Sequence, residues 1–361
     1  MNAKNPSMDD IEYTSLLPLS YMVPTFYPTL PGVPQAVGGA PQVRLADPDL
    51  QARAQRLINV LYLAATEFKD LDGMNDPEAL KVFIAPEFYF RKASEQEAEQ
   101  GRFLRSTSFG SYPESARFVL AEALHEAIHQ SPLFKDWVVV AGTICSQLPR
   151  NPPHRLNLLN TALMLRGRRG AMDASMPYML MEKHYISNID GPPQNWHANL
   201  DPTTTYSFRL NPDQELDNLI FWDGMAVGLE VCLDHSMQVV ANAMNVMNQS
   251  LGTTPNALDL QLVTSCGMSI VNQAVAVSDG SLVMLTDGMS HYLDRLPEPV
   301  FQIGRYDAAA GRVDQLDTRN FEFLELPRTQ DYQVEYFGGR YNRLGRRQGV
   351  WRGEALPLSR G

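Results

Sequence analysis

The chain has 361 residues, of which 44% are hydrophobic and 20% charged, and its formal net charge is −11. This composition excludes a disordered chain, which would lack the apolar surface that offsets the entropy of ordering. The acidic balance argues against a nucleic-acid binder, whose surface would be basic. No apolar run approaches the ~20 residues of a membrane span, so we expect no membrane partner.

The three cysteines indicate a reducing compartment. Their number is odd and too small for a disulfide framework, and none has the spacing of metal ligands. No secretory signal is visible in the first residues. We therefore expect a cytoplasmic protein without a structural metal.

The first part of the chain predicts a strand, a loop and a helix. Residues 16–23 are apolar enough for a short strand, whereas the many prolines and glycines of 24–48 predict a loop. Pro48 opens a helix with Asp47 as its N-cap, and apolar residues recur along it at intervals of three and four. A further strand follows at 81–85.

A capping box and a β-branched run mark the next two elements. Ser111 and Glu114 have the spacing of a capping box, which predicts a helix through His129. Residues 137–144 are apolar on both faces and predict a fully buried strand. Two more strands are expected at 158–165 and 178–183.

The second half of the chain predicts mostly strands. Residues 186–222 resemble a long loop, which in a compact domain is usually functional or hides a missed element. A strand at 225–231 runs directly into a helix at 234–247. The remaining strands are expected at 260–264, 270–277 and 282–285.

This order of elements favours an α/β fold with layered sheets. No second core is visible, so we expect one domain over 1–300. Residues 301–361 form a C-terminal extension that we expect to pack on the body or on a partner subunit.

Two side chains that can move or stabilise charge follow predicted strands. Glu87 stands after the strand at 81–85 and Pro86, where partial desolvation raises its pKa toward that of a general base. Lys183 ends another strand, where an ammonium can face a thiolate or an oxyanion. Each residue alone has an ordinary alternative, a loop cap for Glu87 and a solvated edge for Lys183.

Cys232 lies at the junction of a strand and a helix. This position puts the sulfur over a helix N-terminus, where the dipole is expected to lower the thiol pKa, and offers the N–H of Leu233 to an oxyanion. The sharp strand-to-helix transition is typical of a nucleophile elbow. The alternative is a buried structural cysteine.

Glu87, Lys183 and Cys232 follow in this order, separated by long α/β segments. The arrangement resembles the nitrilase superfamily of carbon–nitrogen hydrolases, whose members use a Glu-Lys-Cys triad. The likeness covers roughly residues 14–290. It extends to three further segments, Ala141-Gly142-Thr143, Asn160-Thr161-Ala162 and Leu262-Val263-Thr264-Ser265.

The resemblance implies a four-layer αββα sandwich of the carbon–nitrogen hydrolase type and hydrolysis through a Cys232 thioester. Glu87 would be the base and Lys183, with Leu233, would hold the oxyanion. Tyr89 and His235 are further candidates for substrate binding. No cofactor or metal is implied, and a homodimer or larger homo-oligomer is expected.

One expected carboxylate has no obvious counterpart. Many amidases of this superfamily carry a second Glu shortly after the lysine, where this chain offers only Asp190. Glu230 is the other candidate, because period-two geometry would turn it to the same sheet face as Cys232, although a buried pairing role suits it better. Asp234 is expected to be a favourable charge in the first helical turn.

These observations favour an enzyme that cleaves a small linear amide or an N-carbamoyl compound. A nitrilase acting on a nitrile is the alternative within the same scaffold. A non-catalytic scaffold of the same fold is the third possibility.

Overall fold

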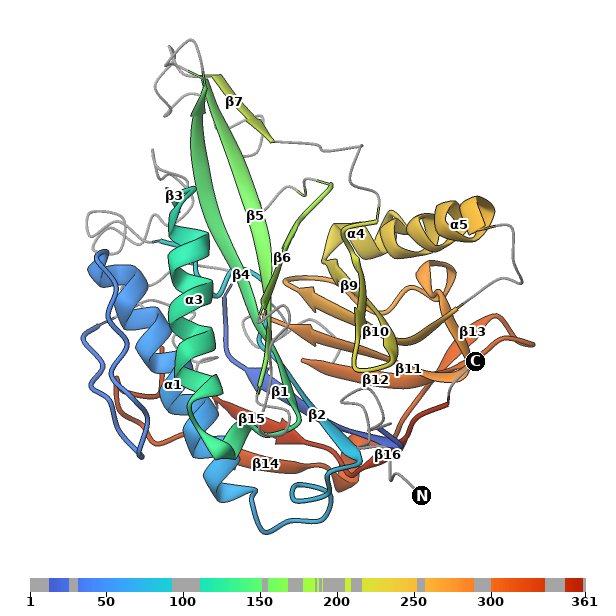
Figure 1. Cartoon of the computed structure of the whole chain (residues 1–361), viewed down its shortest axis with the longest axis horizontal. Helices are drawn as coiled ribbons and strands as arrows, with labels where there is room; N and C mark the ends of the chain where they lie inside the picture. Colours follow the sequence, from blue (N-terminus) through green and yellow to red (C-terminus); the bar gives the residue numbers. More distant parts are fainter. Residues whose placement is uncertain are drawn as a thin grey trace, which may run out of the picture.

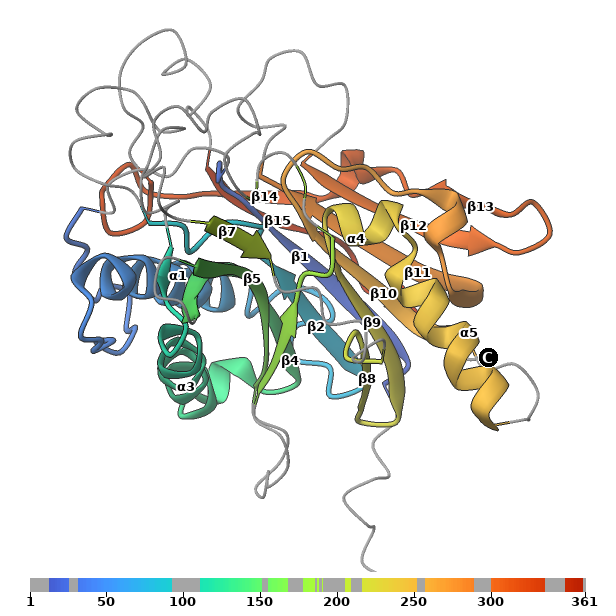
Figure 2. The same cartoon turned by 90° about the horizontal axis from the view of Figure 1, so that it is seen from above.

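The computed structural model describes residues 13–25, 32–92, 111–150, 155–167, 178–185, 187, 190, 205–208, 216–251, 257–288, 300–334 and 348–359. In this part of the chain, two β-sheets pack face to face and helices cover the outer face of each (Figures 1 and 2). The layers therefore have the order helix, sheet, sheet, helix. This is the αββα sandwich expected from the sequence.

The larger sheet, sheet A, has the strand order β14-β15-β1-β2-β4-β5-β6, with β16 beside β1, β3 beside β4 and β7 beside β5. Strands β1, β2 and β4 run parallel, and β5 and β6 continue the sheet antiparallel. Its strands are β1 (Ser15–Met22), β2 (Ala79–Ile84), β3 (Tyr112–Pro113), β4 (Trp137–Arg150), β5 (Arg155–Arg166), β6 (Tyr178–Glu182), β7 (Thr205–Phe208), β14 (Glu322–Glu325), β15 (Gly349–Arg352) and β16 (Leu356–Pro357).

The smaller sheet, sheet B, has the order β13-β12-β11-β10-β9-β8. Its central strands β9, β10 and β11 are parallel, and antiparallel strands flank them on both sides. Its strands are β8 (Leu219–Trp222), β9 (Met225–Val231), β10 (Leu258–Ser265), β11 (Val277–Asp287), β12 (Phe301–Asp307) and β13 (Arg312–Gln315).

The helices lie on opposite outer faces. Helices α1 (Pro48–Glu67) and α3 (Ala116–His129) cover sheet A, while α4 (Leu233–Ser236) and α5 (Val239–Leu251) lie on the side of sheet B (Figure 1). The Asp47 side chain accepts hydrogen bonds from the N–H groups of Asp49 and Leu50, as its N-cap position predicts. Short 3-10 turns occur at η1 (Pro132–Phe134), η4 (Asn272–Ala274) and η5 (Thr318–Asn320).

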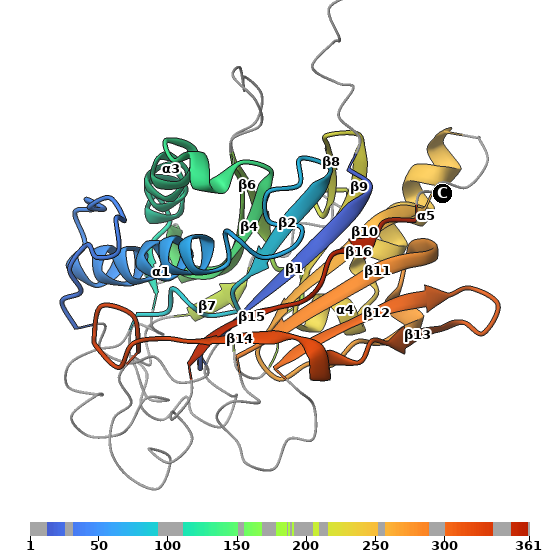
Figure 3. The ribbon, with the colours of Figure 1, turned by 90° about the horizontal axis from the view of Figure 1, so that it is seen from below.

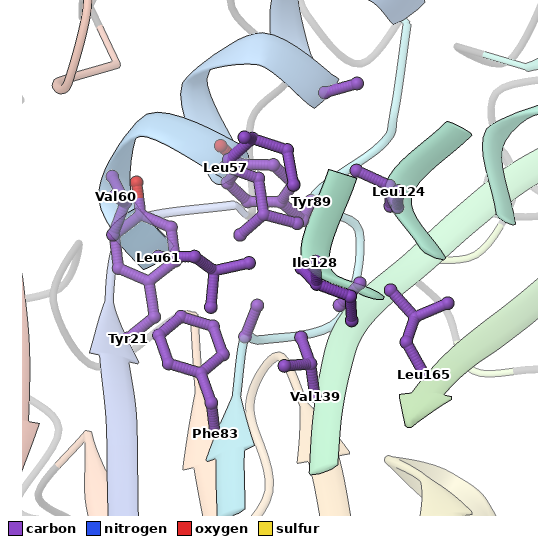
Figure 4. Packing of buried hydrophobic residues seen from close by; sticks show 14 of the residues in the cluster. Tyr21, Leu57, Val60, Leu61, Phe83, Tyr89, Leu124, Ile128, Val139 and Leu165 are labelled. Atoms are coloured by element: carbon purple, nitrogen blue, oxygen red, sulfur yellow. The ribbon is translucent and has the colours of Figure 1, made fainter. Parts of the chain in front are cut away.

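Alternation along the strands divides the buried side chains between two faces. In β2, Phe83 points to the helices and Val82 to sheet B. Figure 4 shows the helix-side core, where Tyr21, Phe83 and Val139 meet Leu61 of α1 and Ile128 of α3. A third core lies between the outer face of sheet B and α5.

The ends of β2 and β10 touch across the two sheets. Thr264 Oγ1 donates a hydrogen bond to Ala85 O at 2.9 Å, and the Glu87 N–H donates to Ser265 O at 3.3 Å. Because β9 lies beside β10, this contact brings the end of β2 close to the end of β9. The sandwich thus places the Glu87 and Cys232 segments together.

Three predicted elements need correction. Ser111 does not cap a helix, because α3 begins at Ala116 and the Ser111 Oγ donates to Gln147 Oε1. The helix predicted at 234–247 is broken into α4 and α5, and residues 270–276 contain the turn η4 rather than a strand. The segment 186–222 contains β7 and β8, so the alternative of a missed element is the one observed.

The described residues after 300 contribute to both sheets. Strands β12 and β13 extend sheet B, whereas β14, β15 and β16 join sheet A at β1 (Figure 3). The division of the chain at residue 300 stays a prediction. Among the helices described, none has the length and apolar character needed to cross a membrane.

Candidate active site

Glu87 is fixed by main-chain hydrogen bonds on both sides. The Ala85 N–H donates to Val140 O at 2.8 Å, and the Phe88 N–H donates to Thr143 Oγ1 at 2.8 Å. Together with the bond from the Glu87 N–H to Ser265 O, these contacts attach the segment to both sheets. The Glu87 side chain is fully buried.

Gly142 permits the close packing of β4 against this segment. Its φ is +79°, and a Cβ at this position would lie 2.5 Å from Pro86 O. Any other residue would therefore push Pro86 and Glu87 out of place. This is the physical reason for a glycine within the Ala141-Gly142-Thr143 segment.

Lys183 follows β6 directly and brings its ammonium to Glu87. Its Nζ lies 2.8 Å from Glu87 Oε1 and 2.6 Å from Asp190 Oδ2, with a longer contact of 3.5 Å to Ser187 Oγ. The lysine side chain is only 2% exposed. An ammonium at this depth requires such partners, because burying an unpaired charge is costly.

Asn160 of β5 connects the two carboxylates. Its Nδ2 donates to Glu87 Oε1 and to Asp190 Oδ1, both at 2.8 Å. Its main-chain carbonyl also accepts the N–H of Lys183 at 2.8 Å. The sequence predicts the Asn-Thr segment but not this contact of Asn160.

Cys232 occupies a strained turn between β9 and α4. Its φ of 50° and ψ of −107° are unfavourable for a residue with a side chain. The Cys232 N–H donates to Thr264 O at 3.0 Å, and Sγ lies 4.0 Å from Cys266 O. The strand-to-helix transition expected at this cysteine is therefore present, with Leu233 as the first residue of α4.

Burial raises the pKa of Glu87 to about 7. The Lys183 charge opposes this shift, and the Asp190 charge adds to it, because two carboxylates share one ammonium. Glu87 Oε2 has no hydrogen-bond partner among the described residues. The carboxyl is thus suited to accept and return a proton near neutral pH.

The expectation of a lowered thiol pKa at Cys232 is wrong. Burial and the charge of Glu87 raise the pKa well above its ordinary value, and Lys183 opposes them only in part. Helix α4 has just four residues, so its dipole is small. Burial alone would lower the pKa of Lys183, but Glu87 and Asp190 raise it, so the ammonium stays charged.

Asp234 connects the segment after Lys183 to the segment after Cys232. Its carboxylate accepts the main-chain N–H groups of His184 at 3.0 Å and Tyr185 at 2.8 Å. Burial raises its pKa to about 8. Asp234 therefore holds two elements of the site together, whereas its role as a favourable charge in the first helical turn stays a prediction.

Glu230 faces away from Cys232 and takes part in a separate network. Its Oε2 lies 2.5 Å from His235 Nδ1 and 2.8 Å from Gln261 Nε2, and its Oε1 accepts the Val240 N–H at 2.9 Å. The shared face expected from period two fails because the positive φ at Cys232 ends the alternation. The buried pairing role expected for Glu230 is the one observed.

Two residues expected to bind substrate take part in buried packing and hydrogen bonding. Tyr89 packs in the helix-side core beside Tyr21 (Figure 4), and its ring also contacts Phe90. His235 is fully buried, with Nδ1 beside Glu230 and Nε2 accepting the Val271 N–H at 2.9 Å. These contacts support structural roles, and the assignment of both residues to substrate binding stays a prediction.

Within the described ranges, no group of three or more His, Cys, Asp or Glu side chains has the arrangement of a metal site. The cluster around Glu87 contains one ammonium and two carboxylates that already contact each other. Its geometry suits proton transfer and stabilisation of a developing negative charge.

No protein-family model and no curated protein matches this sequence. Among solved structures, the chain is similar to the amidase from Nesterenkonia sp. AN1, described as a nitrilase-superfamily protein. A double mutant of that amidase in complex with acrylamide has a TM-score of 0.41 and 11% identity, and the match covers 99% of this chain and 94% of that one. A structure described as an amidase from Nesterenkonia sp. has a TM-score of 0.41 and 12% identity, and the match covers 96% of this chain and 92% of that one.

The glutamine-dependent NAD+ synthetase from Acinetobacter baumannii is also similar, with a TM-score of 0.39 and 11% identity. This match covers 84% of the present chain but only 43% of the synthetase. At such low TM-scores and identities, the functional conclusion rests on the geometry of the site.

Proposed function

We propose that this chain is a thiol-dependent carbon–nitrogen hydrolase of the nitrilase superfamily. Its substrate is a small linear amide or an N-carbamoyl compound, and Cys232 is the nucleophile. One observation carries the proposal. A buried carboxyl with a pKa of about 7, an ammonium and a strained cysteine converge from the ends of β2, β6 and β9.

Acylation begins with transfer of the Cys232 proton to Glu87. The sulfur forms a bond to the carbonyl carbon, and the carbonyl oxygen becomes an oxyanion stabilised by Lys183 and by the Leu233 N–H. Glu87 then gives its proton to the amide nitrogen. The carbon–nitrogen bond breaks, ammonia or an amine leaves, and a thioester remains.

Deacylation uses the same groups in the reverse order. Glu87, ionised again, takes a proton from water, whose oxygen bonds to the thioester carbon. The second oxyanion collapses with cleavage of the carbon–sulfur bond. The proton on Glu87 returns to the sulfur, and the acid is released.

Asp190 fits the place of the second carboxylate of the superfamily's amidases. It contacts Lys183 Nζ at 2.6 Å and raises the pKa of Glu87 through its charge. The 3.5 Å contact of the ammonium to Ser187 Oγ is the longest of its three hydrogen bonds. A substrate oxygen can replace this contact without separating Lys183 from either carboxylate.

Purified protein incubated with a panel of linear amides, N-carbamoyl compounds and nitriles tests the proposal. We expect ammonia release from an amide or carbamoyl substrate, and a mass increase on Cys232 equal to the acyl group. Cys232→Ala should abolish both, whereas Cys145→Ala should retain them. Activity confined to nitriles would support the nitrilase alternative instead.

The non-catalytic alternative predicts a different result. Iodoacetamide would then modify Cys232 no faster than Cys145 and Cys266, which are buried to a similar degree. Absence of turnover together with this equal reactivity would contradict the proposed function.

We also propose a cytoplasmic location, where a thiol nucleophile stays reduced, and a homo-oligomeric state. The three cysteines are free. Light scattering of the purified protein checks the oligomeric state, and a monomer at micromolar concentration would contradict it.

A further inference from the structure

Four buried side chains form a closed ring of hydrogen bonds beside Cys232. Lys183 Nζ contacts Glu87 Oε1 at 2.8 Å and Asp190 Oδ2 at 2.6 Å. Asn160 Nδ2 closes the ring, because it contacts the same Glu87 Oε1 and also Asp190 Oδ1, both at 2.8 Å. The two carboxylates are thus held between one ammonium and one amide.

The orientation of the Asn160 amide follows from its neighbours. Both atoms within hydrogen-bond distance of Nδ2 are carboxylate oxygens, and an ionised carboxylate only accepts hydrogen bonds. A flipped amide would place Oδ1 against these two oxygens. Each N–H of Asn160 therefore points to one carboxylate.

The two oxygens of Glu87 have different surroundings. Oε1 accepts hydrogen bonds from the Lys183 ammonium and the Asn160 amide, whereas Oε2 has no partner among the residues described. A proton on Oε1 would displace one of these donors and leave it buried without a partner. The free energy of protonation therefore favours Oε2.

We propose that Asn160 is a positioning residue that keeps Glu87 Oε1 occupied, so that Oε2 alone exchanges protons with Cys232, the leaving amine and water. This inference rests on the proposed function of Glu87 as the base. Lys183 cannot supply this constraint alone, because its ammonium sits on a flexible stem and must also contact the substrate oxyanion. The amide of Asn160 projects from β5, which is paired with a strand on each side, and takes no part in the chemistry.

Difference infrared spectroscopy tests the proposal on the wild-type protein. The carbonyl stretch of protonated Glu87, assigned by its loss in Glu87→Gln, should have the low frequency of a carbonyl that accepts two hydrogen bonds. A stretch typical of a free carbonyl would overturn the proposal without any Asn160 variant. This measurement needs no substrate.

Two variants extend the test. Asn160→Leu removes the amide at similar volume, and Asn160→Ser leaves space for water and is the milder change. In either folded variant the carbonyl stretch of protonated Glu87 should move to higher frequency. The pH midpoint of Cys232 alkylation should move upward by about one to two units, because the charged carboxylate of Glu87 loses a hydrogen bond. The kcat on an amide should fall at least about tenfold with a smaller change in KM.

Asn218→Leu is the matched control, because Asn218 is fully buried and donates to Leu229 O at 2.6 Å outside the ring. It should lower thermal stability without moving the alkylation midpoint or the carbonyl stretch. A folded Asn160 variant that behaves like this control would overturn the inference. If amides are not hydrolysed but the stretch and midpoint shift as expected, the proposed function fails while the role of Asn160 stands.

Discussion

Two buried polar clusters lie on opposite sides of the end of β9, and they differ in how completely they are paired. In the Glu230 cluster, each carboxylate oxygen has a donor and both ring nitrogens of His235 have a partner. In the Glu87 cluster, two carboxylates share one ammonium and Glu87 Oε2 has no partner among the described residues. Complete pairing is typical of structural networks, whereas an incompletely paired acid can exchange protons.

The difference in pairing also corresponds to a difference in what each cluster connects. Glu230 joins β9 to α5 through the Val240 N–H and to β10 through Gln261. Glu87, by contrast, is held at its main chain and leaves its carboxyl to meet Lys183 and the thiol. The first cluster should therefore determine stability and the second activity.

The largest expected effect concerns the Glu87 cluster. Glu87→Gln or Cys232→Ser should lower kcat/KM for an amide by at least about a thousandfold, because the base or the nucleophile is lost. Steady-state ammonia release measures the effect, and circular dichroism checks the fold. A Glu87→Gln enzyme within tenfold of wild type would remove Glu87 from the mechanism.

Glu230→Gln should act on stability instead. A glutamine amide places its N–H₂ against either the Val240 N–H or the His235 Nδ1 side, so a buried donor loses its acceptor. We expect a loss of about 3 kcal/mol in the free energy of unfolding, measured by urea denaturation. At temperatures where the variant is folded, kcat should change less than about threefold. A larger loss of kcat in the folded variant would show that the Glu230 cluster also determines activity.

The pH dependence of acylation should report Glu87. Since burial raises its pKa to about 7, the rate should increase with pH through a midpoint near 7 and level off above it, where the carboxylate is ionised. Asp190→Asn should lower that midpoint by on the order of one unit, because a charge that raises the pKa is removed. Single-turnover rates across pH 5–9 measure it, and an unchanged midpoint in Asp190→Asn would show that the two carboxylates do not interact.

The same raised pKa predicts an effect on folding. At pH values between the ordinary carboxyl pKa and about 7, Glu87 is protonated in the folded state and ionised in the unfolded state. The contribution of Glu87 to stability is therefore present at low pH and lost as pH rises toward 7. Glu87→Gln should remove this slope. Urea unfolding at several pH values provides the comparison.

The smallest expected effect concerns the turn at Cys232. Glycine tolerates a φ of 50° and a ψ of −107° better than alanine, so Cys232→Gly should be more stable than Cys232→Ala by about 1 kcal/mol. In β4 the order should reverse, with Cys145→Gly less stable than Cys145→Ala. If the glycine variant were less stable than the alanine variant at both Cys232 and Cys145, the turn at Cys232 would not be strained.

Continuous apolar runs made much of the sandwich predictable. The buried runs around 81–85, 137–144 and 225–231 are strands, and Glu87 and Cys232, which follow the first and the third of them, come together where the two sheets meet. The pairing of Ser111 with Gln147 and the turn η4 depend on contacts across sequence distances that local patterns do not encode. Local residue propensities therefore predict the buried strands but not the segments whose structure depends on tertiary contacts.

The site was predictable where it follows strand ends and not where it depends on single dihedral angles. Phe88 has a φ of 64° and Cys232 a φ of 50°. The first turn comes just before Tyr89, which lies in the core, and the second turns the Cys232 side chain away from the sheet face of Glu230. The thiol pKa was predicted in the wrong direction because the depth of burial was unknown. Asn160 was missed because its amide contacts residues 73 and 30 positions away.

The position of β1 has a consequence for synthesis of the protein. This early strand pairs with β15 and β16, which are made from residues 349–357. Until those residues leave the ribosome, one edge of β1 lacks its hydrogen-bonding neighbour, and an open strand edge is a template for aggregation. Sheet A is therefore completed only after residues 349–357 have been made, and until then this edge of β1 is open to pairing with other strands.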